Sequence, residues 1–231
     1  MTTPRRAFLQ SAAALGVAGL APLTLLADEK EKAPKKGEEE EIPATEDLMR
    51  EHGVLNRTLL VYEELLRRIA AKEEVTPAMF HRTAELIRHF IEDYHEKLEE
   101  NFIFPIFEKH QQHTELVKVL RRQHDAGRAL TERILRSSQP DEFRRANTLA
   151  QLSHDCHAFS RMYRPHEARE DTVLFPALRK ILPAKEIEEL GERFEKEEHR
   201  VVGGEGFEKA VAQVAETEKQ LGIYELDQFT P

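Results

Sequence analysis

The stretches 95–105, HEKLEENFIFP, and 166–176, HEAREDTVLFP, spell one pattern twice, 71 residues apart (166 − 95). Each reads His-Glu, two residues, two acids, two residues, an aliphatic residue, Phe and Pro. In an α-helix, residues i and i+4 lie about 40° apart on one face and about 6 Å apart along the axis. His95 therefore points the same way as Glu99, and His166 the same way as Glu170. An imidazole and a carboxylate at this spacing can hold one metal ion or reach two adjacent ions.

The duplication extends upstream of both stretches. Arg-x-His occurs at 50–52 and again at 122–124, so that His52 and His124 lie 72 residues apart (124 − 52). Each repeat thus contributes a lone histidine and then a His-x-x-x-Glu pair. A single pair is as easily explained by a half-exposed helical histidine beside an acid. Because the lone histidine and the His-x-x-x-Glu pair both occur twice, the sequence favours one metal site assembled from two half-sites.

Antiparallel helices give an independent test, because facing residues are equidistant from the loop that joins their helices. The midpoint of His52 and His95 falls near residue 73, inside the loop AKEEVTP, and that of His95 and His124 falls between residues 109 and 110. The midpoint of His124 and His166 is residue 145, whereas the loop signal SSQP lies at 137–140. The last long helix therefore either begins late, near residue 146, or changes register at a kink allowed by Pro165.

Composition and periodicity predict an all-α fold. Charged residues make up 33% of the 231 residues, Gly and Pro number only 10 and 11, and no strand pattern is present. Apolar residues at three- and four-residue steps predict six helices. These cover about 45–72 with Thr45 as N-cap, 77–107 after the Thr76-Pro77 start signal, 114–136, from between 141 and 146 to 180, 183–199, and 206–221. Four long helices with short loops predict an up-down-up-down four-helix bundle, with two additional C-terminal helices packed on it.

The N-terminus predicts export. Arg5-Arg6, followed by Ala-Phe-Leu and a mild apolar stretch at 12–26, is similar to a twin-arginine signal. We expect residues 1–27 to be this signal, 28–44 a charged flexible linker, 45–180 the bundle and 181–231 a C-terminal extension. The alternatives for the first segment are cleavage at another position, an uncleaved segment that stays as an anchor, or an ordinary buried N-terminal helix. Cleavage would leave a periplasmic or extracellular protein without stable membrane insertion.

Charge and cysteine content narrow the function classes. The formal net charge is −9, acids and bases are interleaved, and no basic stripe carries aromatic residues, so nucleic acid is not an expected partner. The single cysteine, Cys156, cannot form an intramolecular disulfide or a thiolate-rich zinc site. His154 and His157 lie on other helix faces than His166, so we expect them at the surface or between helices.

The ligand pattern and the Phe-Pro endings over residues 45–180 resemble hemerythrin-like proteins of the HHE cation-binding class. The resemblance implies a non-heme di-iron site in a four-helix bundle. Its nitrogen ligands would be His52, His95, His124 and His166, and its bridging carboxylates Glu99 and Glu170. Imidazole and carboxylate suit iron, and they also suit manganese and zinc.

The pattern departs from the oxygen-carrying hemerythrins, which have a fifth histidine. About one more coordination position is therefore open, which Glu96 or Glu167 could fill by bending inward, and water otherwise. A more open site should oxidise readily, which makes reversible oxygen carriage doubtful. Three functions follow as alternatives: binding or sensing of dioxygen, nitric oxide or peroxide; a di-iron oxidase, peroxidase or iron-delivery and repair protein; or a structural zinc bundle.

Aromatic residues near the motifs have simpler expected roles. We expect Phe102, Phe104, Phe107 and Phe175 in the core. Tyr163 lies three residues before His166 and therefore near the face of the site, as a packing residue, a hydrogen-bond donor behind the ligands or a redox-active phenol.

Overall fold

The structure is a computed structural model that describes residues 42–231. The predicted signal at 1–27 and nearly all of the predicted linker at 28–44 lie outside the described residues. Across residues 42–231 every regular element is a helix and none is a strand, which confirms the all-α prediction. None of these helices combines the length and the apolar character that a bilayer-spanning segment needs.

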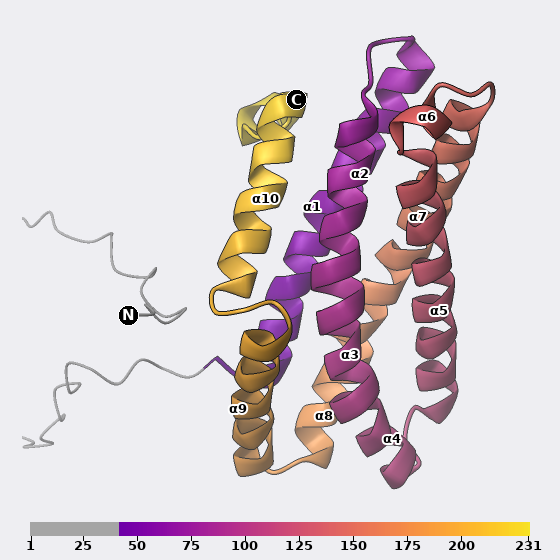
Figure 1. Ribbon diagram of the computed structural model, residues 1–231. Coiled ribbons are helices and arrows are strands. Elements are labelled where there is room, and N and C mark those ends of the chain that lie inside the picture. The colour runs from indigo at the N-terminus through magenta and orange to yellow at the C-terminus, as the bar shows by residue number, and fades with distance from the viewer. Residues whose placement is uncertain (1–41) are drawn as a thin grey trace, which may run out of the picture. The chain divides into compact units, whose positions relative to one another are not determined.

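Four long helical segments lie side by side (Figure 1). The first is α1 (Ala44–Ala71) and the third is α5 (Thr114–Ser137). The second runs continuously through α2 (Pro77–Leu86), η2 (Ile87–His95), α3 (Glu96–Leu98), η3 (Glu99–Ile103) and α4 (Phe104–His110). The fourth runs through α7 (Thr148–Arg169), η4 (Glu170–Leu174) and α8 (Phe175–Ile181). Contacts of α1 with α7, α7 with α5, α5 with α2, and η2 with α1 close the four segments into a ring.

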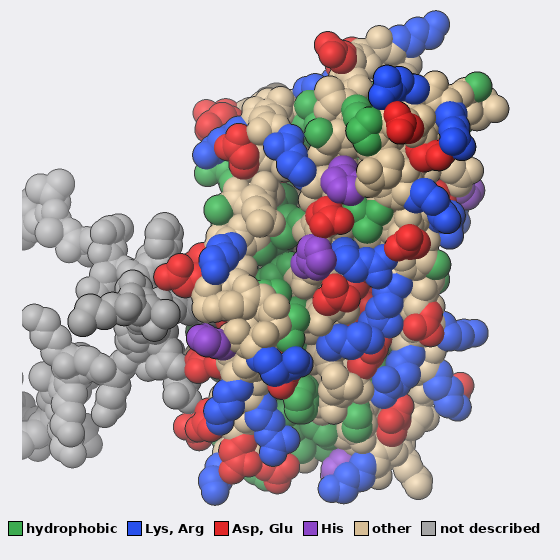
Figure 2. Space-filling view, in the orientation of Figure 1, with side chains coloured by type: hydrophobic (Ala, Val, Ile, Leu, Met, Phe, Trp, Pro, Cys, Tyr) green, Lys and Arg blue, Asp and Glu red, His purple; other side chains and the backbone are tan. Residues whose placement is uncertain are grey.

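The C-terminal helices cover one flank of this ring. α9 (Ala184–Val201) contacts α1 and η2, α10 (Gly206–Leu221) contacts α1 and α2, and a short 3₁₀ turn, η5 (Leu226–Phe229), follows. The Arg57 guanidinium on α1 donates hydrogen bonds to the Glu218 carboxylate on α10. A groove with a cavity of about 760 Å³ runs between α10 and the second segment, where Figure 2 shows apolar side chains between rims of interleaved acidic and basic residues.

Helix starts agree with the sequence in one case and not in another. Thr76 precedes α2 and Pro77 opens it, as predicted. α1, in contrast, begins at Ala44 with Pro43 as its N-cap, so the prediction that Thr45 caps this helix is wrong. Thr45 lies inside the first turn, where its Oγ1 accepts a hydrogen bond of 2.8 Å from Arg179 of α8. The hydroxyl is therefore engaged between helices rather than by its own helix end.

The register of the last long segment follows from a late start. A short helix, α6 (Pro140–Phe143), occupies the connection, and α7 begins only at Thr148. The connection between Ser137 and Thr148 is centred between residues 142 and 143, which approaches the midpoint of His124 and His166. Pro165 lies inside α7 without ending it. The first of the two alternatives, a late helix start, is therefore the one the structure shows.

Both Phe-Pro endings follow a π-helical turn. The backbone N–H of Phe104 donates to the carbonyl of Glu99, and that of Phe175 to the carbonyl of Glu170, each five residues earlier. A proline in an α-helix clashes with the carbonyl four residues before it and lacks a hydrogen-bond donor. The extra residue of a π-turn relieves this conflict locally. Both π-turns begin at a predicted metal ligand, so the repeated motif encodes a local backbone shape as well as a ligand pair.

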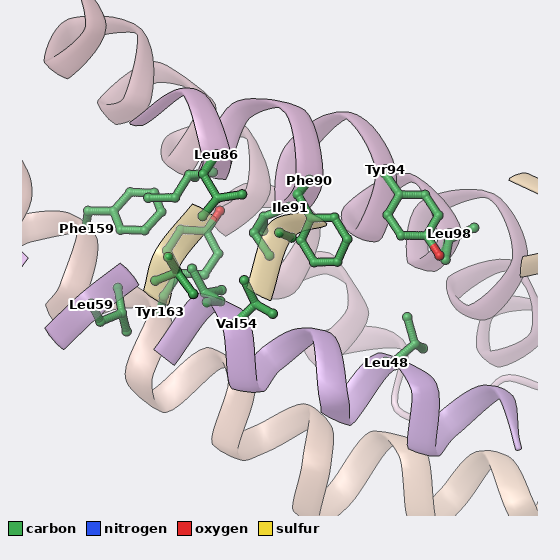
Figure 3. Packing of buried hydrophobic residues seen from close by; sticks show 14 of the residues in the cluster. Leu48, Val54, Leu59, Leu86, Phe90, Ile91, Tyr94, Leu98, Phe159 and Tyr163 are labelled. Atoms are coloured by element: carbon green, nitrogen blue, oxygen red, sulfur yellow. The ribbon is translucent and has the colours of Figure 1, made fainter. Parts of the chain in front are cut away.

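The core is built from large apolar side chains facing the centre of the ring. Figure 3 shows residues of the second segment, among them Ile91 and Tyr94, facing Leu48 and Val54 of α1, with Phe159 of α7 nearby. Phe159 is fully buried and its ring meets that of Tyr62 edge-on, with centroids 5.9 Å apart. Burial of each such side chain contributes about 1.5–3 kcal/mol. This packing keeps water from the polar groups in the interior.

Candidate metal centre

The six side chains predicted from the duplicated motif converge in the interior of the ring. They come from all four long segments: His52 from α1, His95 and Glu99 from the second segment, His124 from α5, and His166 and Glu170 from the fourth. The most exposed of the six, His166, has only 4% of its surface accessible. Charged or chargeable groups are rarely buried to this extent unless they are paired or bind metal.

The imidazoles form two pairs. The Nε2 atoms of His52 and His95 lie 3.1 Å apart, and those of His124 and His166 lie 3.3 Å apart. Each pair joins histidines from adjacent segments and different positions in the motif. The lone histidine of each repeat thus faces the motif histidine of the same repeat.

Each carboxylate spans the two imidazole pairs. Oε2 of Glu99 lies 3.7 Å from Nε2 of His95 and 3.4 Å from Nε2 of His124. Oε2 of Glu170 lies 3.1 Å from Nε2 of His166 and 3.4 Å from Nε2 of His52. This places both carboxylates between the pairs, the position required of groups that bridge two ions.

The outward-facing Nδ1 atoms all have a hydrogen-bond acceptor from another helix. Their acceptors are Asp171 Oδ1 for His52 (2.8 Å), Glu51 Oε2 for His95 (2.8 Å), Glu100 Oε1 for His124 (3.1 Å) and Gln123 Oε1 for His166 (3.0 Å). An acceptor at Nδ1 fixes the proton there, which leaves the lone pair of a neutral ring on the inward Nε2. All four rings are thus oriented as metal ligands are.

Two observations test whether cations fit this donor set. First, two neutral imidazoles that direct Nε2 lone pairs at one another across 3.1 Å repel unless a cation or proton lies between them. Two nitrogens bound to one ion at about 2.1 Å and at right angles are about 3.0 Å apart, so this spacing suits a shared ion. Second, no described residue donates a hydrogen bond of normal geometry to either carboxylate oxygen of Glu99 or Glu170. The donor set fits iron, manganese or zinc.

The pKa values of the histidines show how the buried carboxylate charges are compensated when no metal is bound. Burial disfavours a charged His124, but Glu96, Glu100 and Glu99 outweigh burial and raise its pKa to about 10. Burial likewise opposes charge on His52, whose pKa Asp171 and Glu170 nevertheless raise well above the usual value. For His95 burial dominates and lowers the pKa to about 4. In the metal-free protein, protons on His52 and His124 thus compensate the buried carboxylates.

The Phe-Pro endings contact two of the predicted ligands directly. The ring of Phe104 stacks on His124 with centroids 5.5 Å apart, and Phe175 stacks on His52 at 5.7 Å. Both phenylalanines are fully buried, as is Phe107, so their expected core positions are confirmed, while Phe102 is only partly buried. Each repeat therefore supplies an aromatic lid for the lone histidine of the other repeat.

Glu96 and Glu167 are buried beside the centre but are engaged elsewhere. Glu96 accepts a hydrogen bond of 2.5 Å from Tyr163 Oη and pairs with Arg128 at 2.6 Å. Glu167 accepts a hydrogen bond from Asn56, and burial raises its pKa to about 8. Neither carboxylate lies in the groups formed by the six inner side chains, although Glu96 lies 4.0 Å from the outer Nδ1 of His124.

The other histidines, the cysteine and the tyrosine named from the sequence lie away from the centre or behind it. His154 and His157 are exposed, as expected, and Cys156 is fully buried, which raises its thiol pKa. Tyr163 is buried, and its ring lies 5.3 Å from that of His166.

The sequence did not identify the residues that support the predicted ligands through their Nδ1 atoms. The available signal was their position, because Glu51, Gln123, Glu100 and Asp171 each adjoin a predicted ligand in the sequence.

Comparisons with known proteins agree with this geometry. Residues 44–156 match the family model described as "Hemerythrin HHE cation binding domain", a span that includes His52, His95, Glu99 and His124 and ends before His166. Uncharacterized proteins of Mycobacterium bovis and of Mycobacterium tuberculosis are each 46% identical over 231 residues, covering 98% of this chain and 91% of the relative. No solved structure matches the chain. The chain thus belongs to one family with these mycobacterial proteins and carries a hemerythrin HHE cation binding domain.

Proposed function

We propose that the protein holds two iron ions, one at each imidazole pair, and there binds or reacts with dioxygen, nitric oxide or peroxide. The observation that supports this most is the placement of Glu99 and Glu170, each within 3.7 Å of imidazole nitrogens from both pairs. Two carboxylates in this position can join two cations, whereas a single structural ion would need only one cluster of ligands.

The protein's own residues have defined tasks in this function. The four histidines and two glutamates hold the ions. Asp171, Glu51, Glu100 and Gln123 orient the imidazoles through their Nδ1 atoms. Phe104 and Phe175 cover two of the rings and exclude water. A bound iron pair would supply redox and Lewis-acid chemistry, and six protein ligands leave coordination positions for a small ligand.

An oxidase or peroxidase is a second candidate, favoured by Tyr163. This buried phenol donates a hydrogen bond to Glu96 and contacts His166, so an oxidisable side chain lies directly behind a ligand. We also propose that residues 1–27 direct export by the twin-arginine route, which would place the protein in the periplasm or outside the cell.

Anaerobic purification followed by metal analysis and exposure to air separates these functions. Two irons per chain, with an oxo-bridged absorption band that forms in air, would support the proposed function. Rapid turnover of peroxide by the iron-loaded protein would favour the enzyme. Tightly bound zinc that does not exchange for iron, with no colour, would contradict both and favour a structural bundle.

A further inference from the structure

The two imidazole pairs have different outer partners. Nδ1 of His52 and Nδ1 of His95 each face a carboxylate, Asp171 and Glu51 respectively. In the other pair, His166 faces the neutral amide of Gln123. His124 faces Glu100, whose carboxylate also accepts hydrogen bonds from Lys97 and Arg128 at 2.5 Å each. One pair is thus supported by two carboxylates, and the other by an amide and a carboxylate that two cations share.

Because the two halves of the centre come from an internal repeat, their outer partners can be compared at corresponding positions. Gln123 corresponds to Glu51, because both immediately precede the lone histidine of their repeat. Arg128 likewise corresponds to Asn56, because each follows its lone histidine by four residues. At both positions the His124 repeat has the less negative residue. The contacts of Asn56 and Arg128 also correspond. Asn56 donates a hydrogen bond to Glu167, and Arg128 forms an ion pair with Glu96.

The charge of an outer partner changes the ligand that it supports. A carboxylate that accepts the Nδ1 proton makes the imidazole more basic and its Nε2 a stronger donor to a cation. A neutral amide does this less, and so does a carboxylate whose charge is already compensated by Arg and Lys. Both effects act in the same direction here, so the outer partners of His52 and His95 favour donation to a cation more than those of His124 and His166 do.

We propose that the two halves of the centre bind cations unequally: the position at His52 and His95 fills first and holds its ion more tightly, and the position at His124 and His166 fills second and loses its ion first. Gln123 is then a positioning residue that sets this difference. The inference rests on the proposed function, since it requires two cations in the centre.

Titration of the metal-free full chain with Co²⁺, followed by calorimetry and by the visible absorption of the bound ion, tests this proposal. We expect two resolved binding steps. Gln123→Glu should tighten the second step by about tenfold and bring the two steps together, whereas Glu51→Gln should weaken the first by about 10- to 100-fold. Gln112→Glu, an exposed substitution of the same charge in the loop before α5, is the matched control and should leave both steps unchanged.

The possible outcomes distinguish failure of the proposed function from failure of the inequality between the two cation positions. Absence of any Co²⁺ binding would overturn the proposed function itself. Two equal steps in the natural protein, or an unchanged ratio of the steps in Gln123→Glu, would overturn only the inequality. Because Gln123 is partly exposed and Glu51 is fully buried, Gln123→Glu provides a valid test even where Glu51→Gln fails to fold. Helix content measured by circular dichroism identifies such a failure.

Discussion

The Nε2 atoms of His52 and His95 face one another at 3.1 Å, while Nδ1 of each ring lies 2.8 Å from a carboxylate oxygen. These two side chains come from α1 and from the second helical segment, 43 residues apart in the sequence. The carboxylates hold the ring protons on the outer side, so the facing nitrogens are free to share a cation. His124 and His166 likewise face one another through Nε2, at 3.3 Å, but their Nδ1 atoms face the Glu100 carboxylate and the Gln123 amide. The centre is thus two imidazole pairs with Glu99 and Glu170 between them.

Loss of either carboxylate that lies between the two imidazole pairs should release metal. Glu99→Ala and Glu170→Ala each remove a group that contacts both imidazole pairs, so we expect most bound metal to be lost in each variant. His157→Ala is the control, because His157 is exposed on α7 and touches no residue of the centre that the structure describes. Metal analysis by mass spectrometry measures the effect. Equal metal content in all three variants would refute the assignment.

Metal binding should release protons near neutral pH. The pKa of His124 is raised to about 10 and that of His52 well above 6.5, so both rings are protonated at pH 7 in the metal-free protein and must lose a proton to bind an ion. Affinity should therefore fall as pH is lowered. Calorimetric titration in buffers of different ionisation enthalpy counts the protons. No proton release at pH 7 would mean that the rings are already neutral.

The metal-free protein should lose stability as pH rises. A histidine whose folded pKa lies above its unfolded value contributes stability that is fully present below the unfolded pKa, about 6.5, and is lost as pH rises through the folded pKa. For His124 this window extends from about 6.5 to about 10. Urea unfolding in the presence of a chelator should show the decline, and His124→Gln should remove part of it. A flat profile between these limits would contradict the pairing of His124 with buried carboxylates.

Gly127 should be intolerant of a larger residue. A Cβ at this position would lie 2.0 Å from Tyr163 Oη, closer than non-bonded atoms approach. Gly127→Ala should therefore displace the tyrosine from Glu96 and destabilise the fold by about 1–3 kcal/mol. Gly53→Ala is the matched control on α1, where a Cβ meets nothing within 4 Å, and should stabilise by up to about 1 kcal/mol. Thermal unfolding distinguishes the two, and equal shifts would contradict the close packing of Tyr163.

The convergence of the six inner side chains could be predicted from sequence because they obey a local rule. His95 with Glu99 and His166 with Glu170 share a face at i, i+4 spacing, and the duplication separated this signal from chance. The approximate ends of the helices could also be predicted, because Pro, Gly and apolar periodicity are local signals too. The family-model match stops at residue 156, so His166 and Glu170 of the fourth segment rest on the internal repeat and on the resemblance of the motifs over residues 45–180.

The outer partners could not be predicted, because they depend on which helices face one another. Glu51 supports His95 on another helix, and its place beside His52 in the sequence does not show which imidazole it contacts. The π-turns were also missed, although each Phe-Pro ending gave a signal: a proline inside a continuous helix demands a local change of hydrogen bonding. The start of α7 at Thr148 depends on the short α6 helix, whose four residues are too few for periodicity to reveal.

The most direct test of the central claim is the location of the ions. Crystals of the iron-loaded protein, examined by anomalous diffraction at the iron absorption edge, should show two peaks per chain. One should lie beside His52 and His95 and the other beside His124 and His166, with Glu99 and Glu170 between them. A single peak, or peaks outside these six side chains, would contradict the proposed two-ion centre.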